Sequence, residues 1–219
     1  MKQITQLQCR PINMGSLLRF SQAVFIMVIL LYASPLACQN AIESIRELKQ
    51  GTLILRFPAF KPKIDTLQSM ISRSDSEVNK KRLQLLLDEA IEERESIQND
   101  YTAAFREFYN FSKVAWFNDF ESRSLSSAHY YQLDKTPVEY NDLKKGPVFY
   151  LIFDRTEESK LGGLIITDHE LKPVERPFPN NFSTGGLGVL LNKFSNITLA
   201  ASHAKKINKK LHKFYGSVN

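Results

Sequence analysis

The sequence is poor in cysteine, and this lack excludes several kinds of site. Both cysteines of the 219-residue chain, Cys9 and Cys38, stand near its start. If residues 1–38 are removed as a targeting segment, the remaining chain can form no internal disulfide. It also has no redox pair of the C-x-x-C type and no cysteine-rich zinc site. Its length is sufficient to bury a core without such cross-links.

Motifs of common catalytic and metal sites are absent as well. The four histidines are scattered, and no H-E-x-x-H or H-x-H pattern occurs. The glycines at 185–188 fit neither a dinucleotide-binding nor a Walker pattern, and there is no G-x-S-x-G nucleophile motif. We therefore expect no cofactor, and no enzyme class can be assigned from motifs.

Acidic residues are missing from both ends of the chain, before Glu43 and after Glu175. The first acid-free region contains three basic residues, then an apolar run from Phe20 to Ala33, then small residues. This order is typical of a secretory signal. We predict that residues 1–38 are a signal peptide and that residues 39–219 form a single α+β domain. The domain would be exported to the periplasm or the medium.

Two alternatives to a removed signal remain open. Counted over residues 20–37, the apolar stretch approaches the length of about twenty residues that a spanning helix needs, so it could be retained as an anchor. Cys38 follows Ala37, which partly matches a lipid attachment signal. A lipid on Cys38 would also anchor the protein to a membrane.

The net charge gives no indication of a nucleic-acid partner. The chain has 29 basic and 23 acidic residues, and three of the basic ones lie in the predicted signal. The remaining domain therefore has a charge of 26 − 23 = +3. Such a mildly basic domain lacks the strong positive charge typical of nucleic-acid binding.

Hydrophobic periodicity predicts an α+β (or α/β) domain. Strands are expected at 52–57, 113–117, 147–153 and 163–168, and residues 171–177 could pair with the last of these. Helices are expected at 61–71, over about 35 residues from a Ser74–Glu77 capping box, and at 199–215. The long helix could break near Gln98–Asn99. We expect a small mixed sheet of about four to five strands, packed by the long amphipathic helix and the C-terminal helix. Residues 177–188 are predicted to be a loop.

The order of these elements resembles the thioredoxin-like arrangement. Pro147 stands just before the third strand, where that family places a cis proline. The sequence departs from the family because no cysteine pair follows its first strand. The resemblance therefore implies a thioredoxin-like fold without redox activity.

Four segments resemble a group of uncharacterised exported proteins of Bacteroidota. They are GTLILRFPAF, AFREFYNFSKVAWF, ERPFPNNF and INKKLHKFYG, and they are spread over most of the predicted domain. The resemblance agrees with export but implies no activity.

The C-terminal helix contains the first candidate site, a row of lysines. They are Lys205, Lys206, Lys209, Lys210 and Lys213. Apolar residues occupy the opposite side of the same helix, so it is amphipathic and basic. Such a helix can contact an anionic surface, although a solvated lysine face on a packed terminal helix has the same pattern.

Charged residues after two predicted strands form the second candidate. Asp119 and Glu121 follow the second strand, and Asp154 and Arg155 follow the third. If the two strands are parallel, both pairs lie at the edge of the sheet where open α/β sheets bind ligands. The sequence Asp168–His169–Glu170 could act as an acid–base group, but it falls at a predicted turn, where exposed polar residues are expected.

Two functions follow from these features. The first is a non-enzymatic envelope protein that binds an envelope partner or an anionic lipid surface through the lysine row. The second is an enzyme with an acidic cleft at the strand ends.

Overall fold

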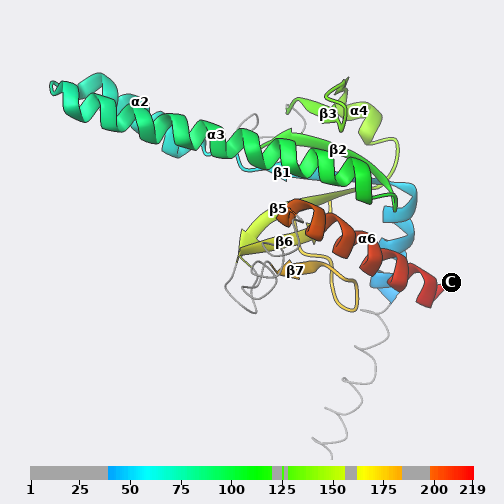
Figure 1. The fold of residues 1–219 in the computed structure, drawn as a ribbon. Helices are drawn as coiled ribbons and strands as arrows, with labels where there is room; N and C mark the ends of the chain where they lie inside the picture. Colours follow the sequence, from blue (N-terminus) through cyan, green and yellow to red (C-terminus); the bar gives the residue numbers. More distant parts are fainter. Residues whose placement is uncertain (1–38, 120–124, 126–127, 156–161, 184–197) are drawn as a thin grey trace, which may run out of the picture.

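The computed structural model describes residues 39–119, 125, 128–155, 162–183 and 198–219 (Figure 1). The predicted signal, the alternative anchor over 20–37 and Cys38 lie outside these residues. In the part of the chain that is described, no helix combines the length and the apolar character needed to cross a membrane.

One mixed sheet of seven strands organises the structure. The strands are β1 (Thr52–Phe57), β2 (Lys113–Asn118), β3 (Tyr130–Gln132), β4 (Pro137–Val138), β5 (Val148–Arg155), β6 (Gly162–Thr167) and β7 (Asn181–Ser183). Their order in the sheet is β4-β3-β2-β1-β5-β6-β7. β1 is parallel to β2 and β5, and the outer pairs are antiparallel. The predicted α+β class is confirmed.

The expected number of four to five strands was too low. β3, β4 and β7 have only two or three residues each, which is too short for a periodic pattern to reveal. β7 lies in a segment that was predicted to be a loop. Residues 171–177 do pair with β6, through an antiparallel bridge from Pro173 to Thr167 and a hydrogen bond from the Val174 amide to the Ile166 carbonyl (3.2 Å), but they form no strand of their own. A proline has no N–H to donate, so it does not continue a ladder.

The helices agree more closely with the sequence. Residues 39–50 are helical, and they are followed by α2 (Lys61–Arg73), α3 (Glu77–Phe108), α4 (Tyr140–Leu143) and α6 (Leu199–Val218). α3 has 32 residues and continues through Gln98–Asn99 without a break. The predicted cap at Ser74 was wrong, because Ser74 ends α2 and the side chain of Ser76 caps α3.

Three helices cover one face of the sheet. The buried cluster there joins apolar residues of helix 39–50, the second half of α3, and α6 to alternate residues of the strands. From β1 it takes Leu53, Leu55 and Phe57, which point to the same side because side chains alternate along a strand. α3 and α6 run side by side over this face (Figure 1).

The opposite face has a thinner cover. Ile54, Phe117 and Tyr150 are buried there against α4 and neighbouring segments, with Tyr140, Leu143 and Leu171 among the residues packed on them. The rings of Tyr130 and Tyr140 stack within this cover, with centroids 5.3 Å apart. The central strands β1 and β5 are therefore buried on both faces.

Pro147 does not have the position that the thioredoxin-like resemblance implies. Within the described residues the cis peptide bond is Arg176–Pro177. The carbonyl of Pro147 accepts a hydrogen bond from the Thr52 amide (2.9 Å) at the amino end of β1, because β5 is parallel to β1. α3 begins at the far end of the hairpin that it forms with α2 (Figure 1), whereas Pro147 lies beside Gly51 and Thr52 at the start of β1. The thioredoxin-like fold remains unconfirmed.

α2 and the first half of α3 form a helical hairpin that projects beyond the sheet (Figure 1). We call residues 61–94 the arm. Its two helices enclose a small apolar cluster of their own, around Ile64, Leu67, Leu87 and Ala90. The second half of α3 then joins the main core.

Candidate functional site

The carboxyl ends of β2 and β5 share one edge of the sheet, as the second candidate site requires, because both strands are parallel to β1. Asp119 lies at this edge, and its hydrogen bonds stabilise the fold. Its amide donates to the carbonyl of Phe57 (3.0 Å), and its Oδ1 accepts from the amide of Ala59 (2.9 Å). The carboxylate of Asp119 thus fastens the end of β2 to the chain that leaves β1.

The other members of this candidate site are not brought together in the described structure. Glu121 lies outside the described residues. Asp154 and Arg155 end β5, where their backbones pair with Gly163 and Gly162. The structure does not describe their side chains. Within the described residues, no three histidine, cysteine or acidic side chains form a group that could hold a metal ion. The acidic cleft stays a prediction.

The turn at 168–170 is held by its own backbone contacts. Asp168 Oδ1 accepts hydrogen bonds from the amides of Glu170 (2.8 Å) and Lys172 (2.9 Å). The side chain of His169 is 76% exposed. These are the features of an aspartate-stabilised surface turn rather than of an acid–base site.

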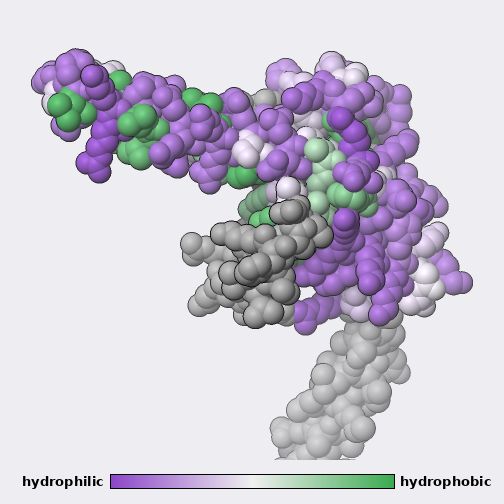
Figure 2. All heavy atoms as spheres, in the orientation of Figure 1, coloured by the Kyte–Doolittle hydropathy of each residue, from purple (hydrophilic) through white to green (hydrophobic). Residues whose placement is uncertain are grey.

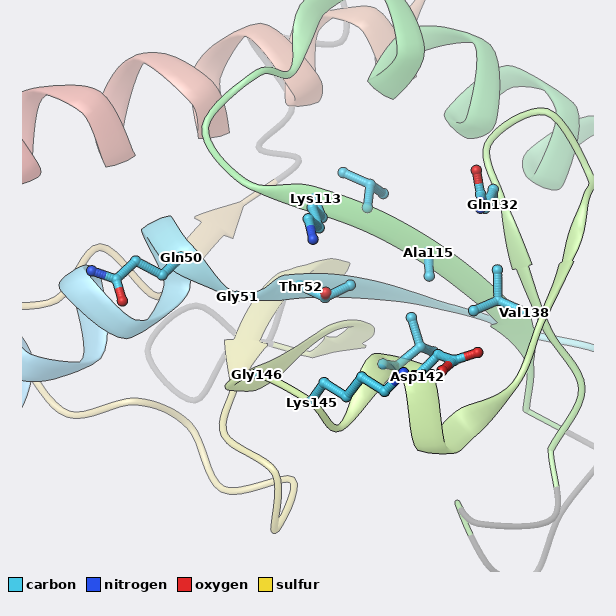
Figure 3. A pocket seen from close by; sticks show the side chains of 12 residues that line it. Gln50, Gly51, Thr52, Lys113, Ala115, Gln132, Val138, Asp142, Lys145 and Gly146 are labelled. Carbon is cyan, nitrogen blue, oxygen red and sulfur yellow. Dashed lines mark ion pairs between the residues drawn. The ribbon is translucent and has the colours of Figure 1, made fainter.

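A cavity of about 620 Å³ opens at the opposite edge of the sheet, near the amino ends of β1 and β2 (Figure 3). Its polar lining includes Thr52, Lys113, Gln132, Asp142 and Lys145. Lys145 is paired with Asp142 (2.7 Å), and this hydrogen bond raises the pKa of the lysine. Among the lining residues there is no histidine, cysteine or serine.

The lysine row of α6 occupies one exposed side of the helix. Lys205, Lys206, Lys209, Lys210 and Lys213 are all exposed, and we call them the lysine face. The opposite side is packed into the core by Ala204, Ile207 and Leu211, each 0% exposed. Thr198 caps the start of the helix, and its side chain accepts from the Ala201 amide. The predicted amphipathic arrangement of α6 is thus confirmed. Contact of the lysine face with an anionic surface stays a prediction.

No described carboxylate forms a salt bridge with the lysine face. Two of its lysines contact aromatic rings instead. Lys205 Nζ lies 4.0 Å from the ring centroid of Phe108, and Lys210 Nζ lies 5.2 Å from that of Phe182. Burial, and secondly the charge of Lys206, lower the pKa of Lys210. The lysines therefore repel one another, and no described carboxylate compensates their charge.

Two further cations lie near the end of α6, and the sequence pattern did not reveal them as part of this site. Arg46 donates to the carbonyl of Val218 (3.1 Å), and Lys49 Nζ lies 4.9 Å from the ring of Phe111. That ring contacts His212 of α6 edge-on. Both cations come from helix 39–50, more than 160 positions earlier in the chain, so a local pattern could not reveal their place.

Comparisons with known proteins provide no family for this chain. No family model, no curated protein and no solved structure matches it. The resemblance to exported proteins of Bacteroidota therefore stays a prediction, and the function has to be argued from the geometry.

Proposed function

We propose that this protein is an exported, non-enzymatic binding protein of the cell envelope that contacts anionic phospholipid through the lysine face of α6. The observation that carries this proposal is the position of five exposed lysines within nine residues, Lys205 to Lys213, without a carboxylate partner among the described residues. Their positive charges are compensated when phosphate groups approach them.

The energetic contribution comes chiefly from the lysines that make no aromatic contact. Lys206, Lys209 and Lys213 project from α6 without a ring beneath them in the described structure. A basic residue near an anionic membrane contributes about 1 kcal/mol. Three such residues supply about 3 kcal/mol, which corresponds to roughly a hundredfold in binding. Because the charges are exposed, salt screens this attraction.

The composition of the face favours lipid headgroups over an acidic protein. Strong protein–protein contacts have aromatic or apolar residues at their centre, surrounded by polar ones. The exposed side of α6 between 205 and 213 consists of lysine with His212, and its large apolar residues are turned inward. Lysine is a flexible point charge and suits phosphates that have no fixed arrangement.

Vesicle co-sedimentation tests the proposal. The full chain, in the form in which its host accumulates it, is mixed with vesicles of phosphatidylglycerol and with neutral vesicles of phosphatidylcholine. The neutral vesicles measure any binding that does not depend on charge. A variant with all five lysines of the face changed to glutamine should lose roughly a hundredfold in affinity for the anionic vesicles.

A charge-matched control separates the face from the net charge. Five exposed lysines elsewhere, Lys61, Lys63, Lys113, Lys135 and Lys145, are changed to glutamine in the control. This control should bind almost as well as the unchanged protein. Equal losses in the two variants would overturn the proposal, because binding would then follow net charge alone. Retention of binding by the α6 variant would overturn it as well.

A further inference from the structure

The arm exposes apolar side chains that the sheet and its helices do not cover. Met70 is 50% exposed, Val78 78%, Leu85 65% and Leu86 39%. Green patches interrupt the purple surface of the arm in Figure 2. Four of the five exposed large apolar residues in the described chain are in the arm. Concentration of such residues in one region is a mark of an interaction surface.

Two of these side chains, Met70 and Leu86, line a groove between the two helices. A hollow of about 550 Å³ is lined by Met70 and Arg73 of α2 and by Arg82, Leu83 and Leu86 of α3. Residues 78, 82, 85 and 89 follow one another at steps of three or four, so they share the exposed side of α3. A partner helix laid along this side would cover both the groove and the exposed leucines.

The charges of the arm are divided along its length. Near the free end, α3 has Lys80, Lys81 and Arg82 in succession. Toward the sheet it has Asp88, Glu89, Glu92 and Glu93. Neither Arg82 nor Glu89 forms a salt bridge within the described chain. Two such arms laid antiparallel would bring the basic part of each against the acidic part of the other.

We propose that the arm binds the arm of a second copy of this chain, antiparallel, with the two-fold axis between Leu85 and Leu86. In this register, position i of one α3 faces position 171 − i of the other. Leu85 then meets Leu86, and Arg82 meets Glu89, twice each because a two-fold interface is isologous. The apolar contact excludes water at the centre, and the ion pairs set the direction.

The length of the arm agrees with this register. The turn before α3 ends at Ser76, about ten residues from the axis. On the other side, α3 first packs against the main core at Ile97, about eleven residues from the axis. At 1.5 Å per residue both distances are about 15 to 17 Å. Each free end therefore reaches the body of its partner without overlapping it.

The same residues fit a membrane less well. The extreme end of the arm consists of Ser74, Asp75, Ser76 and Glu77, so two carboxylates would enter an anionic surface first. The apolar residues lie along the side of the arm instead. A side-on contact with an elongated partner is therefore favoured over insertion of the tip.

Sedimentation velocity with charge-reversed variants tests the proposal. The full chain, as its host accumulates it, should sediment as a dimer. Arg82→Glu or Glu89→Arg alone should weaken the dimer at least about tenfold, because like charges then face each other. The double variant Arg82→Glu/Glu89→Arg should restore it, because the two charges have changed places. Within one chain, positions 82 and 89 are two turns apart, so the rescue cannot arise inside α3.

A matched control keeps the charge change but moves it off the face. Glu95→Arg lies six residues beyond Glu89 and on another side of the helix, and should leave the dimer intact. Circular dichroism of each variant checks that the helices are retained. If the unchanged protein is monomeric at all concentrations, the proposal is overturned. This holds even if the protein binds vesicles through the arm. The proposal is also overturned if the single charge reversals do not weaken the dimer, or if the double variant does not restore it.

Discussion

Tyr101 Oη and His203 Nδ1 lie 2.7 Å apart, and their hydrogen bond joins α3 to α6 inside the core. Both residues are buried, His203 with 3% of its surface exposed. The contact joins α6 to the long helix on the same side as Ala204, Ile207 and Leu211, whose burial turns the lysine face outward.

Stability should fall as the pH is lowered through this histidine. Burial, and secondly the charge of Lys206, lower the pKa of His203 from 6.5 to about 4. Below pH 6.5 the histidine of the unfolded chain is protonated, whereas His203 of the folded chain stays neutral until about pH 4. The stabilisation is therefore complete above pH 6.5 and is lost progressively as the pH falls toward 4. The loss should reach about 3 kcal/mol and is measurable by urea unfolding at a series of pH values.

His203→Gln isolates this effect from other groups that titrate in the same range. The glutamine can still bond to Tyr101, but it does not bind a proton between pH 4 and 6.5. Its unfolding free energy should vary with pH by about 3 kcal/mol less than that of the unchanged protein. An identical pH dependence in both proteins would show that His203 is not the group responsible.

Gly51→Ala should destabilise the protein. A Cβ at this position would collide with the carbonyl oxygen of Pro147 and would lie 2.9 Å from that of Glu47. Because both are backbone atoms beside the start of β1, neither can move aside easily. We expect a cost of about 1 to 3 kcal/mol in denaturant unfolding.

Gly216→Ala is the matched control for the glycine variant. Nothing lies within 4 Å of a Cβ at Gly216, which is in the last turns of α6. Alanine there should leave stability unchanged or raise it by up to about 1 kcal/mol. Equal effects of the two variants would contradict the close approach at Gly51.

Asp119→Ala should cost about 1 to 2 kcal/mol, because the amide of Ala59 would lose its acceptor. Asp119→Asn keeps an oxygen in the same place, so most of the stability should be retained. Unfolding in denaturant compares the two variants. If asparagine cost as much as alanine, the charge of Asp119 rather than the hydrogen bond would be responsible for the stabilisation.

Long periodic segments made much of the fold predictable. The stripe of α3 and the apolar runs of β1 and β5 identified these elements because each buries a continuous face. The short strand β7 was not predicted, because Asn181 and Ser183 are typical loop residues. What keeps it in the sheet is pairing with β6 and the burial of Phe182, and neither is local in sequence.

The candidate sites likewise divide into local patterns, which the sequence reveals, and contacts between distant residues, which it does not. The lysine row was evident because all five residues lie on a single helix. Asp119 could be placed at the correct edge, but its bond to Ala59 joins residues sixty positions apart, so its structural task was hidden. The exposed leucines of the arm were not singled out, because a leucine on a helix gives no sign of whether anything covers it.

Chemical labelling of lysine amines in the presence of phosphatidylglycerol vesicles tests the central claim most directly. The full chain is labelled with and without vesicles, and the modified lysines are identified by mass spectrometry. The account predicts that Lys206, Lys209 and Lys213 become protected, whereas Lys113 and Lys145, which line the cavity at the amino ends of β1 and β2, react as before. Unchanged reactivity of the three α6 lysines on chains bound to the vesicles would contradict it.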